Sequence, residues 1–171
     1  MNVVAKFEKV SIDEFLKAFP IESSVDKDTC ESMWNDITLP RRGTVESAGY
    51  DFKSPYDFIL APGETIKIPT GIKACIDMGW FLGILPRSSM GFKYRLQLDN
   101  TMGIIDSDYY NNPDNEGHIF IKVTNDSKTN KTLMIKAGES FAQGIFIPYG
   151  ITCDDNPVKD FRVGGIGSTG K

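Results

Sequence analysis

The amino-acid sequence predicts an all-β domain, either a barrel or a sandwich. From Tyr50 onward, short apolar or alternating runs recur, and turns rich in Gly, Pro, Asn and Asp separate them, which is typical of many short strands. All 16 glycines lie at or after Gly43, so the first 42 residues have a different character. With 171 residues, 40% of them hydrophobic, the chain is long enough to bury the core of one domain spanning 1–171.

The N-terminal region predicts one strand and two short helices. Residues 1–10 mix charged and apolar side chains as a strand would. Ser11 and Glu14 have the spacing of a capping box, which begins a helix, and Pro20 ends it. Apolar residues at helical spacing follow in two sets: Ile12, Phe15, Leu16 and Phe19, then Cys30, Met33, Trp34 and Ile37. Residues 11–37 therefore predict a helical insertion, which either packs on the domain or binds a protein partner.

The β region divides into seven predicted strands. Their apolar residues alternate or run continuously over the short lengths that strands prefer. The strands are residues 57–60, 65–68, 72–76, 80–85, 118–124, 132–136 and 140–147. Gly63, Gly79 and Gly138 stand in the turns between them, where glycine adopts a left-handed backbone at low cost.

The last ten residues, 162–171, contain four glycines and almost nothing to bury. Ordering such a segment is entropically costly, so it predicts either a frayed terminus or a flexible lid. As a lid, its backbone N–H groups, the hydroxyls of Ser168 and Thr169, and Arg162 would suit a polyphosphate. The segment lacks the strand, the ending and the following helix of a Walker A loop.

Composition excludes several classes of function. The formal net charge of −4 argues against a nucleic-acid-binding protein. Because no run approaches 18 apolar residues and no signal peptide precedes the domain, we expect no membrane association and a cytoplasmic location. The three cysteines have no metal-ligand spacing, and His118 is the single histidine. An enzymatic base would therefore be a carboxylate, and any metal would be bound by oxygen.

Four polar segments within the β region carry candidate chemistry. They are residues 47–51, 86–91, 100–110 and 138–143. Arg87 with its two following hydroxyls supplies donors suited to phosphate oxygens. Asp106 follows the apolar pair Ile104-Ile105, and a carboxylate at the end of a buried run can be held rigidly enough to act as a base.

Taken together and in this order, the segments resemble the five motifs of trimeric dUTP diphosphatases (dUTPases). The resemblance covers residues 40–171. The matching residues are Ala48 to Asp51, Pro86 to Gly91, Asn100 with Gly103 to Tyr109, Gly138 to Gln143, and Arg162 to Gly170.

The resemblance implies a jelly-roll-like β-barrel that forms a homotrimer, in which the tail of one subunit closes over a shared site. It also implies hydrolysis of dUTP to dUMP and pyrophosphate with Mg²⁺. Asp106 would activate the attacking water, and Asp51 would act on the metal through water. The implied substrate-binding residues are Arg87, Ser88, Ser89, Asn100, Ile104, Ile105, Tyr109, Phe120, Gln143, Arg162, Ile166, Gly167, Ser168 and Thr169.

The chain departs from the family pattern in three places. Ile166 stands where the family has a Phe that covers uracil, so this aliphatic side chain or another aromatic such as Phe92, Tyr94 or Tyr110 must cover the base. Ser89 stands where glycine is common in motif two, and the loop after Tyr109 is long. The insertion at 11–37 is also not a general family feature.

Two other functions fit parts of the same pattern. The related dCTP deaminases share the Pro-Arg-Ser-Ser sequence, but this chain has Lys122 where their strand carries a glutamate, and a lysine cannot replace that proton-shuttling carboxylate. A regulatory or binding protein on a dUTPase scaffold would use residues 11–37 to dock a partner.

Overall fold

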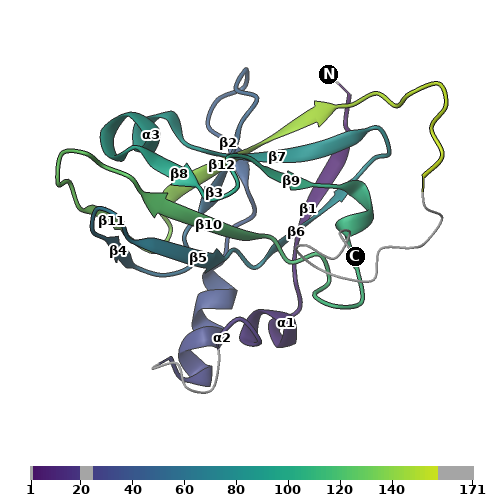
Figure 1. The fold of residues 1–171 in the computed structure, drawn as a ribbon. Helices are drawn as coiled ribbons and strands as arrows, with labels where there is room; N and C mark the ends of the chain where they lie inside the picture. The colour runs from purple at the N-terminus through teal and green to yellow at the C-terminus, as the bar shows by residue number, and fades with distance from the viewer. Residues whose placement is uncertain (1, 20–24, 158–171) are drawn as a thin grey trace.

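Residues 2–19 and 25–157 are described by the computed structural model, and most of their regular structure is β (Figure 1). The strands are β1 (Ala5–Lys9), β2 (Arg41–Arg42), β3 (Tyr50–Lys53), β4 (Phe58–Leu60), β5 (Thr65–Pro69), β6 (Ile72–Ile76), β7 (Trp80–Pro86), β8 (Leu96–Leu98), β9 (Gly103–Ile105), β10 (Phe120–Asn125), β11 (Leu133–Ile135) and β12 (Ser140–Pro148). The helices are α1 (Ile12–Leu16), α2 (Lys27–Asp36), α3 (Ser88–Tyr94) and the 3₁₀ turn η1 (Ser107–Tyr109). The predicted all-β class is confirmed, and the strands form a jelly-roll-like fold.

The largest sheet brings four of the motifs onto neighbouring strands. Its order is β2-β3-β12-β7-β9, and β12 pairs antiparallel with both β3 and β7. This register places Gln143 of β12 opposite Asp51 of β3 and opposite Leu85 of β7, two residues before Arg87. Strand β9 pairs with β7 at the sheet edge and leads directly into Asp106.

Alternating side chains of the strands fill one hydrophobic core. In β8 and β11 the residues are buried, exposed and buried in turn, as the period of two requires. Phe52, Ile68, Ile121 and Phe141, from four different strands, are among the largest fully buried side chains. Among residues 2–19 and 25–157, no helix has the length and apolar character needed to cross a membrane.

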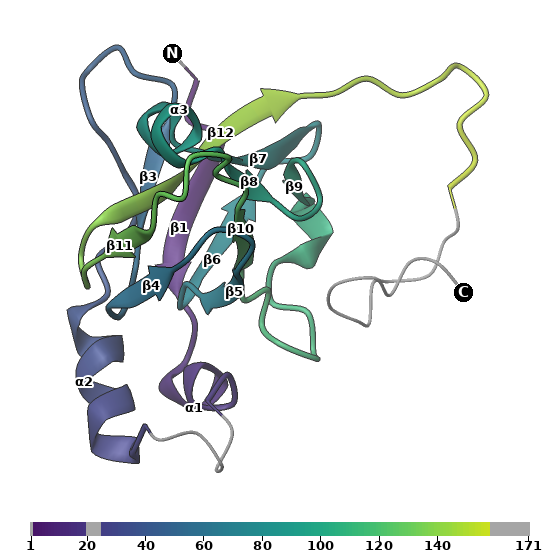
Figure 2. The same ribbon diagram turned by 60° about the vertical axis from the view of Figure 1, so that its left-hand side comes forward.

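The two predicted N-terminal helices form, and they lie at the end of the barrel away from α3 (Figure 2). The hydroxyl of Ser11 accepts a hydrogen bond from the Glu14 N–H at 3.1 Å and so caps α1. The reciprocal hydrogen bond of the predicted capping box would run from the Ser11 N–H to the Glu14 carboxylate. The Ser11 N–H donates instead to the Glu116 carboxylate, at 3.0 Å. Glu14 is instead buried, with 4% of its surface exposed.

The helices are packed onto the domain. Phe15 of α1 is fully buried, and Cys30 of α2 is 2% exposed. The indole N–H of Trp34 donates to the carbonyl of Val10 at 3.0 Å, which ties α2 to the end of β1. These contacts support the packing role of residues 11–37, and none of them calls for a protein partner.

His118 lies fully buried between α1 and the barrel. Its Nε2 accepts a hydrogen bond from the Gly71 N–H at 2.9 Å. Burial lowers the pKa of His118 to about 4. The charge of Glu116 raises this pKa by a smaller amount, and the charge of Lys67 lowers it slightly. The ring is therefore neutral at neutral pH.

We expect acid to destabilise the fold through His118. Below its unfolded pKa of 6.5 the unfolded chain binds a proton that the folded chain does not bind until the pH approaches 4, so the free energy of unfolding falls across this interval. The pKa difference corresponds to about 3 kcal/mol. Urea titrations of the wild type and of His118→Gln, at pH values of about 7, 5.5 and 4 and at one protein concentration, measure the loss. The variant should lose less stability over the interval, and equal losses would contradict the assignment.

Candidate active site

A cavity of about 560 Å³ opens between β8, β9, η1 and β10, and we call it the β9 pocket. Five predicted substrate-binding residues line it: Asn100, Ile104, Ile105, Tyr109 and Phe120. Its volume is in the range of small-molecule sites. The structure thus brings together side chains from three separate stretches of the sequence.

A tight turn between β8 and β9 holds Asn100 at the pocket. The Met102 N–H donates to the Asn100 carbonyl at 2.7 Å, and Thr101 between them has a φ of 66°. A Cβ on Gly103 would lie 3.1 Å from the Ile84 Cβ, so glycine lets β9 lie close against β7. As an edge strand, β9 presents main-chain N–H and C=O groups on its outer side, which suits recognition of a planar ligand edge.

Asp106 follows β9 directly, and its backbone carbonyl accepts the Tyr109 N–H at 3.2 Å at the start of η1. The sequence predicted that Asp106 ends a buried run, and this is wrong: Ile104 is 55% exposed, because β9 is an edge strand. The carboxylate is exposed as well, next to the pocket rather than among its lining residues. The backbone of Asp106 is thus held, while its side chain remains accessible to water.

Tyr109 forms a buried wall of the pocket, with 4% of its surface exposed. Its hydroxyl donates to the His118 carbonyl at 3.0 Å and accepts from the Asn115 amide at 2.8 Å. The long loop after Tyr109 therefore returns to fix the ring that precedes it.

Two lysines of the pocket bring positive charge that the motifs do not contain. Lys67 of β5 has its Nζ 4.2 Å from the centre of the Phe120 ring, and Lys122 of β10 lies 2.6 Å from an Asp99 oxygen. Hydrogen bonds from Lys122 and then Thr124 lower the pKa of Asp99, which keeps it ionised. Sequence reasoning missed Lys67, which reaches the pocket because β5 pairs with β10 in a register that places Lys67 opposite Lys122.

The other predicted residues form a second cluster around Arg87. The Arg87 Nε lies 3.1 Å from an Asp51 oxygen, and its Nη1 donates to the Ser140 carbonyl at 3.4 Å. The Gln143 amide donates to the Pro86 carbonyl at 3.2 Å. A Cβ at Gly49 would lie 2.5 Å from the Gln143 Oε1, so motifs one and four meet here, and a larger residue at position 49 would displace the Gln143 amide.

This second cluster opens on a different hollow of about 370 Å³. Arg87 and Ser89 line it together with residues of α3 and β11, and Ser88 is the first residue of α3. Asp51 lines a third hollow, of about 250 Å³, and Ser88 and Gln143 line neither of the first two. Within one chain, the predicted residues of the described part therefore lie around separate hollows. Arg162, Ile166, Gly167, Ser168 and Thr169 lie outside the described residues.

The residues of the described part that bear on a metal are few. In this part of the chain no three His, Cys, Asp or Glu side chains gather into a metal-ligating cluster. Asp51, whose side chain is 26% exposed, places carboxylate oxygens beside Arg87. Mg²⁺ is commonly bound through one or two carboxylates together with substrate phosphates, so this donor set fits an ion that arrives with a nucleotide.

Comparisons with known proteins show which family the chain belongs to. The dUTPase family model matches residues 35–170. A deoxyuridine 5'-triphosphate nucleotidohydrolase of Lactococcus lactis is 46% identical over 135 residues, which are 78% of this chain and 89% of the relative. One of Tolumonas auensis is 40% identical over 145 residues, 80% of this chain and 90% of the relative. The crystal structure of dUTPase from Streptococcus mutans matches with a TM-score of 0.63 and 36% identity, over 85% of this chain and 97% of that one. The chain therefore belongs to the dUTPase family.

Proposed function

We propose that this protein hydrolyses dUTP to dUMP and pyrophosphate with Mg²⁺, by attack of an Asp106-activated water on the α-phosphorus. The observation that supports it best is the β9 pocket, which combines an edge strand, an amide and two aromatic rings beside an exposed carboxylate. Its size suits a nucleoside, and the exposed Asp106 follows Ile105, which lines the pocket.

We assign the β9 pocket to the nucleoside. Asn100 and the main chain of Ile104 and Ile105 read the edge of uracil, and Phe120 packs against the base. Tyr109 packs on deoxyribose and disfavours a 2′-hydroxyl, because its ring is buried and its hydroxyl is held by two hydrogen bonds. Asp106 contacts the 3′-hydroxyl.

We assign the Arg87 cluster to the phosphates. Arg87 offers a planar set of donors, and Ser88 and Ser89 add hydroxyls at the start of α3. Gln143 completes the cluster from β12. We assign the tail residues Arg162, Ser168 and Thr169 to the outer phosphates, and Ile166 and Gly167 to the base.

Bound Mg²⁺ would neutralise phosphate charge near Asp51, which the acidic protein cannot do alone. Asp106 orients a water and accepts its proton. The water oxygen bonds to the α-phosphorus, the bond from that phosphorus to its bridging oxygen breaks, and pyrophosphate leaves with the electron pair. Arg87 stabilises the charge that develops on the phosphate oxygens.

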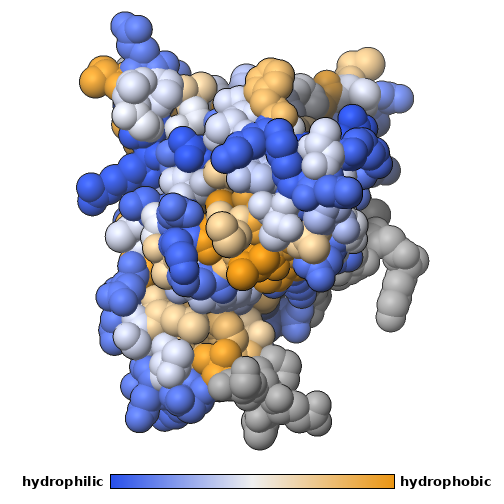
Figure 3. All heavy atoms as spheres, turned by 90° about the vertical axis from the view of Figure 1, so that its left-hand side faces the viewer, coloured by the Kyte–Doolittle hydropathy of each residue, from blue (hydrophilic) through white to orange (hydrophobic). Residues whose placement is uncertain are grey.

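We place each complete site between subunits of a homotrimer, because the two halves of the site open on different hollows of one chain. Figure 3 shows an apolar patch within a polar surround on the face formed by α3, β4 and β11. Phe92, Ile59 and Met134 of these elements are 94%, 65% and 66% exposed. Exposed apolar patches mark contacts between proteins, and the hollow beside Arg87 is lined by Met134 on this same face.

The rival deaminase reaction finds little support in the β9 pocket. Lys122 lines the pocket, as its sequence position indicated. Asp99 is the carboxylate among the lining residues, and Lys122 and Thr124 hold it as an ionised acceptor rather than a proton donor.

We expect pyrophosphate release from dUTP to exceed release from UTP, dCTP and dTTP by at least about 100-fold in kcat/KM. Each rival differs from dUTP at a group that the pocket contacts. UTP adds a 2′-hydroxyl, dCTP has an amine in place of a carbonyl, and dTTP adds a methyl group. In water enriched in ¹⁸O, the label should enter dUMP and not pyrophosphate, because the attack is on the α-phosphorus.

Ammonia release from dCTP would overturn the proposed reaction in favour of the deaminase. If the ¹⁸O label appeared in pyrophosphate, dUTP would remain the substrate but the proposed attack on the α-phosphorus would be refuted.

A further inference from the structure

Helix α1 places a buried carboxylate behind the β9 pocket. Glu14 is 4% exposed, although the capping of α1 does not use its side chain. One carboxylate oxygen lies 3.1 Å from the Lys17 Nζ, and the other lies 3.6 Å from the Nδ1 of His118. Burying a carboxylate costs free energy that must be offset by specific partners, so this placement needs an explanation.

The partner of Glu14 has a defined tautomer. His118 Nε2 accepts the Gly71 N–H, so the single proton of the neutral ring is on Nδ1, the atom that faces Glu14. Among buried side-chain nitrogens and oxygens of residues 2–19 and 25–157, Nδ1 is the atom without a hydrogen bond. A small movement of Glu14 would supply one. The charged groups around the ring are Glu14 from α1, Glu116 from the loop and Lys67 from β5.

His118 in turn supports two walls of the β9 pocket. Its ring lies 4.2 Å from that of Phe120, centre to centre, and Phe15 of α1 packs on it from 6.2 Å. The carbonyl of His118 accepts the hydroxyl of Tyr109. The ring and backbone of this one residue thus contact the side chains assigned to base and sugar.

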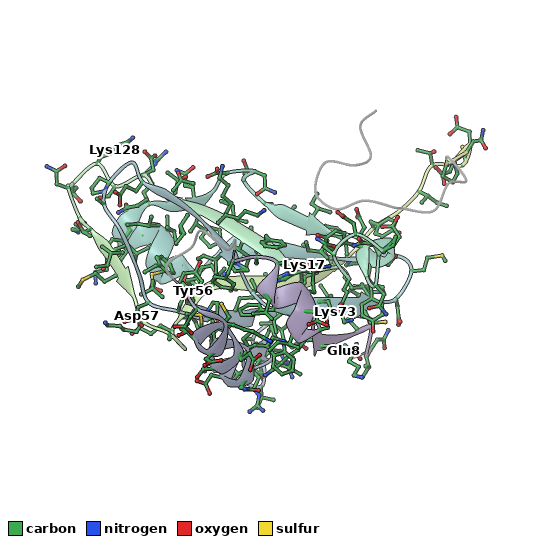
Figure 4. The ribbon with its side chains drawn as sticks, turned by 90° about the horizontal axis from the view of Figure 1, so that it is seen from below. Glu8, Lys17, Tyr56, Asp57, Lys73 and Lys128 are labelled. Carbon is green, nitrogen blue, oxygen red and sulfur yellow. The ribbon has the colours of Figure 1, made fainter. Side chains whose placement is uncertain are left out.

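A second contact fixes the loop between these walls. Ser11 donates to Glu116 through its N–H and its hydroxyl, and Lys73 of β6 lies 3.3 Å from the same carboxylate. Asn115, next to Glu116, holds the Tyr109 hydroxyl. Figure 4, seen from below, shows α1 with Lys17 under the barrel, and Lys73 and Glu8 on the strands beside it.

We propose that Glu14 is a positioning residue for nucleoside binding. It orients His118, whose ring contacts Phe120 and whose backbone carbonyl accepts the Tyr109 hydroxyl. The proposal rests on the assignment of the β9 pocket to the nucleoside. It gives the N-terminal insertion a role in the active site, although no residue of α1 lines the pocket.

We expect Glu14→Ala to raise KM for dUTP about five- to tenfold while kcat changes less than about twofold, because the base and sugar walls loosen but Asp106 and Arg87 remain. Glu14→Gln keeps an oxygen that accepts from Nδ1, so its KM should stay within about twofold of the wild-type value. Cys30→Ala is the matched control: it empties a buried position of the same insertion, on α2 rather than α1, and should lower Tm without changing KM.

The single histidine allows a readout that does not depend on activity. In protein labelled with ¹⁵N-histidine, the wild type and Glu14→Gln should show one ring with the proton on Nδ1, and Glu14→Ala should show a mixture of ring states. An unchanged KM in Glu14→Ala, an equal rise in KM in Cys30→Ala, or one unaltered ring state in Glu14→Ala would overturn the proposal. A wild type that does not hydrolyse dUTP would instead refute the proposed function. The ¹⁵N spectra distinguish failure of the proposed function from failure of the Glu14 proposal, because they do not depend on activity.

Discussion

Replacing Asp106 by Asn should lower kcat for dUTP about 10²- to 10⁴-fold, the range that a positioned general base contributes. The amide has the same shape but cannot accept the proton of the attacking water. Binding should persist, because the residues that contact base, sugar and phosphates are unchanged. The affinity for a non-hydrolysable dUTP analogue should therefore stay within about threefold of the wild-type value, while single-turnover hydrolysis measures the loss of the chemical step.

The control for this variant is Asp57→Asn, the same change of charge on an exposed carboxylate of a different surface. Asp57 pairs with Lys136 at 2.7 Å and does not line the β9 pocket. It should change stability little, because the ion pair is exposed to solvent, and it should leave kcat unchanged. Hydrolysis by Asp106→Asn at a rate close to that of Asp57→Asn would remove Asp106 from its role.

Much of the fold could be predicted because the strand signal is local. The seven segments proposed in the β region all contain strands, and the two sets of helically spaced residues lie mainly in α1 and α2. The helices are shorter than predicted, because Phe19 and Ile37 lie beyond their last residues. Strands β2, β3, β8 and β9 lie outside those segments, and none is longer than four residues. Strands β3 and β9 overlap the polar segments 47–51 and 100–110, which were interpreted as candidate chemistry rather than as strands. Helix α3 was missed because its residues, 88–94, are half polar and none is buried.

The site was predictable only as a set of motifs. Spacing and order indicated which residues matter, and five of them do share one pocket. Their partners depend on long-range register, which a single sequence does not reveal: Lys67 reaches Phe120 through the pairing of β5 with β10. The same limit applies to Ser11, whose predicted reciprocal partner was Glu14 but whose N–H is taken by Glu116, 105 residues away.

Two inactive variants should restore each other when they assemble into one trimer. Arg87→Ala removes the centre of the phosphate cluster and the partner of Asp51, so this chain alone should be nearly inactive. Asp106→Asn is inactive for a different reason, at the β9 pocket. If each site takes its pocket from one subunit and its phosphate cluster from the next, a subunit with intact Asp106 beside one with intact Arg87 forms a working site.

Co-expression of the two variants with different affinity tags, followed by purification over both tags, isolates trimers that contain both chains. A mixed trimer has three interfaces between neighbouring subunits. Whichever variant is present in two copies, one of the three interfaces joins intact Asp106 of one subunit to intact Arg87 of the next. The mixed trimers should therefore recover about one third of the wild-type rate. The control is a trimer in which every subunit carries Asp106→Asn and both tags are present. It should hydrolyse dUTP no faster than the untagged Asp106→Asn variant. A site built from one chain predicts no recovery at all, since every chain in the mixture lacks one half. The two hollows seen on each subunit favour recovery.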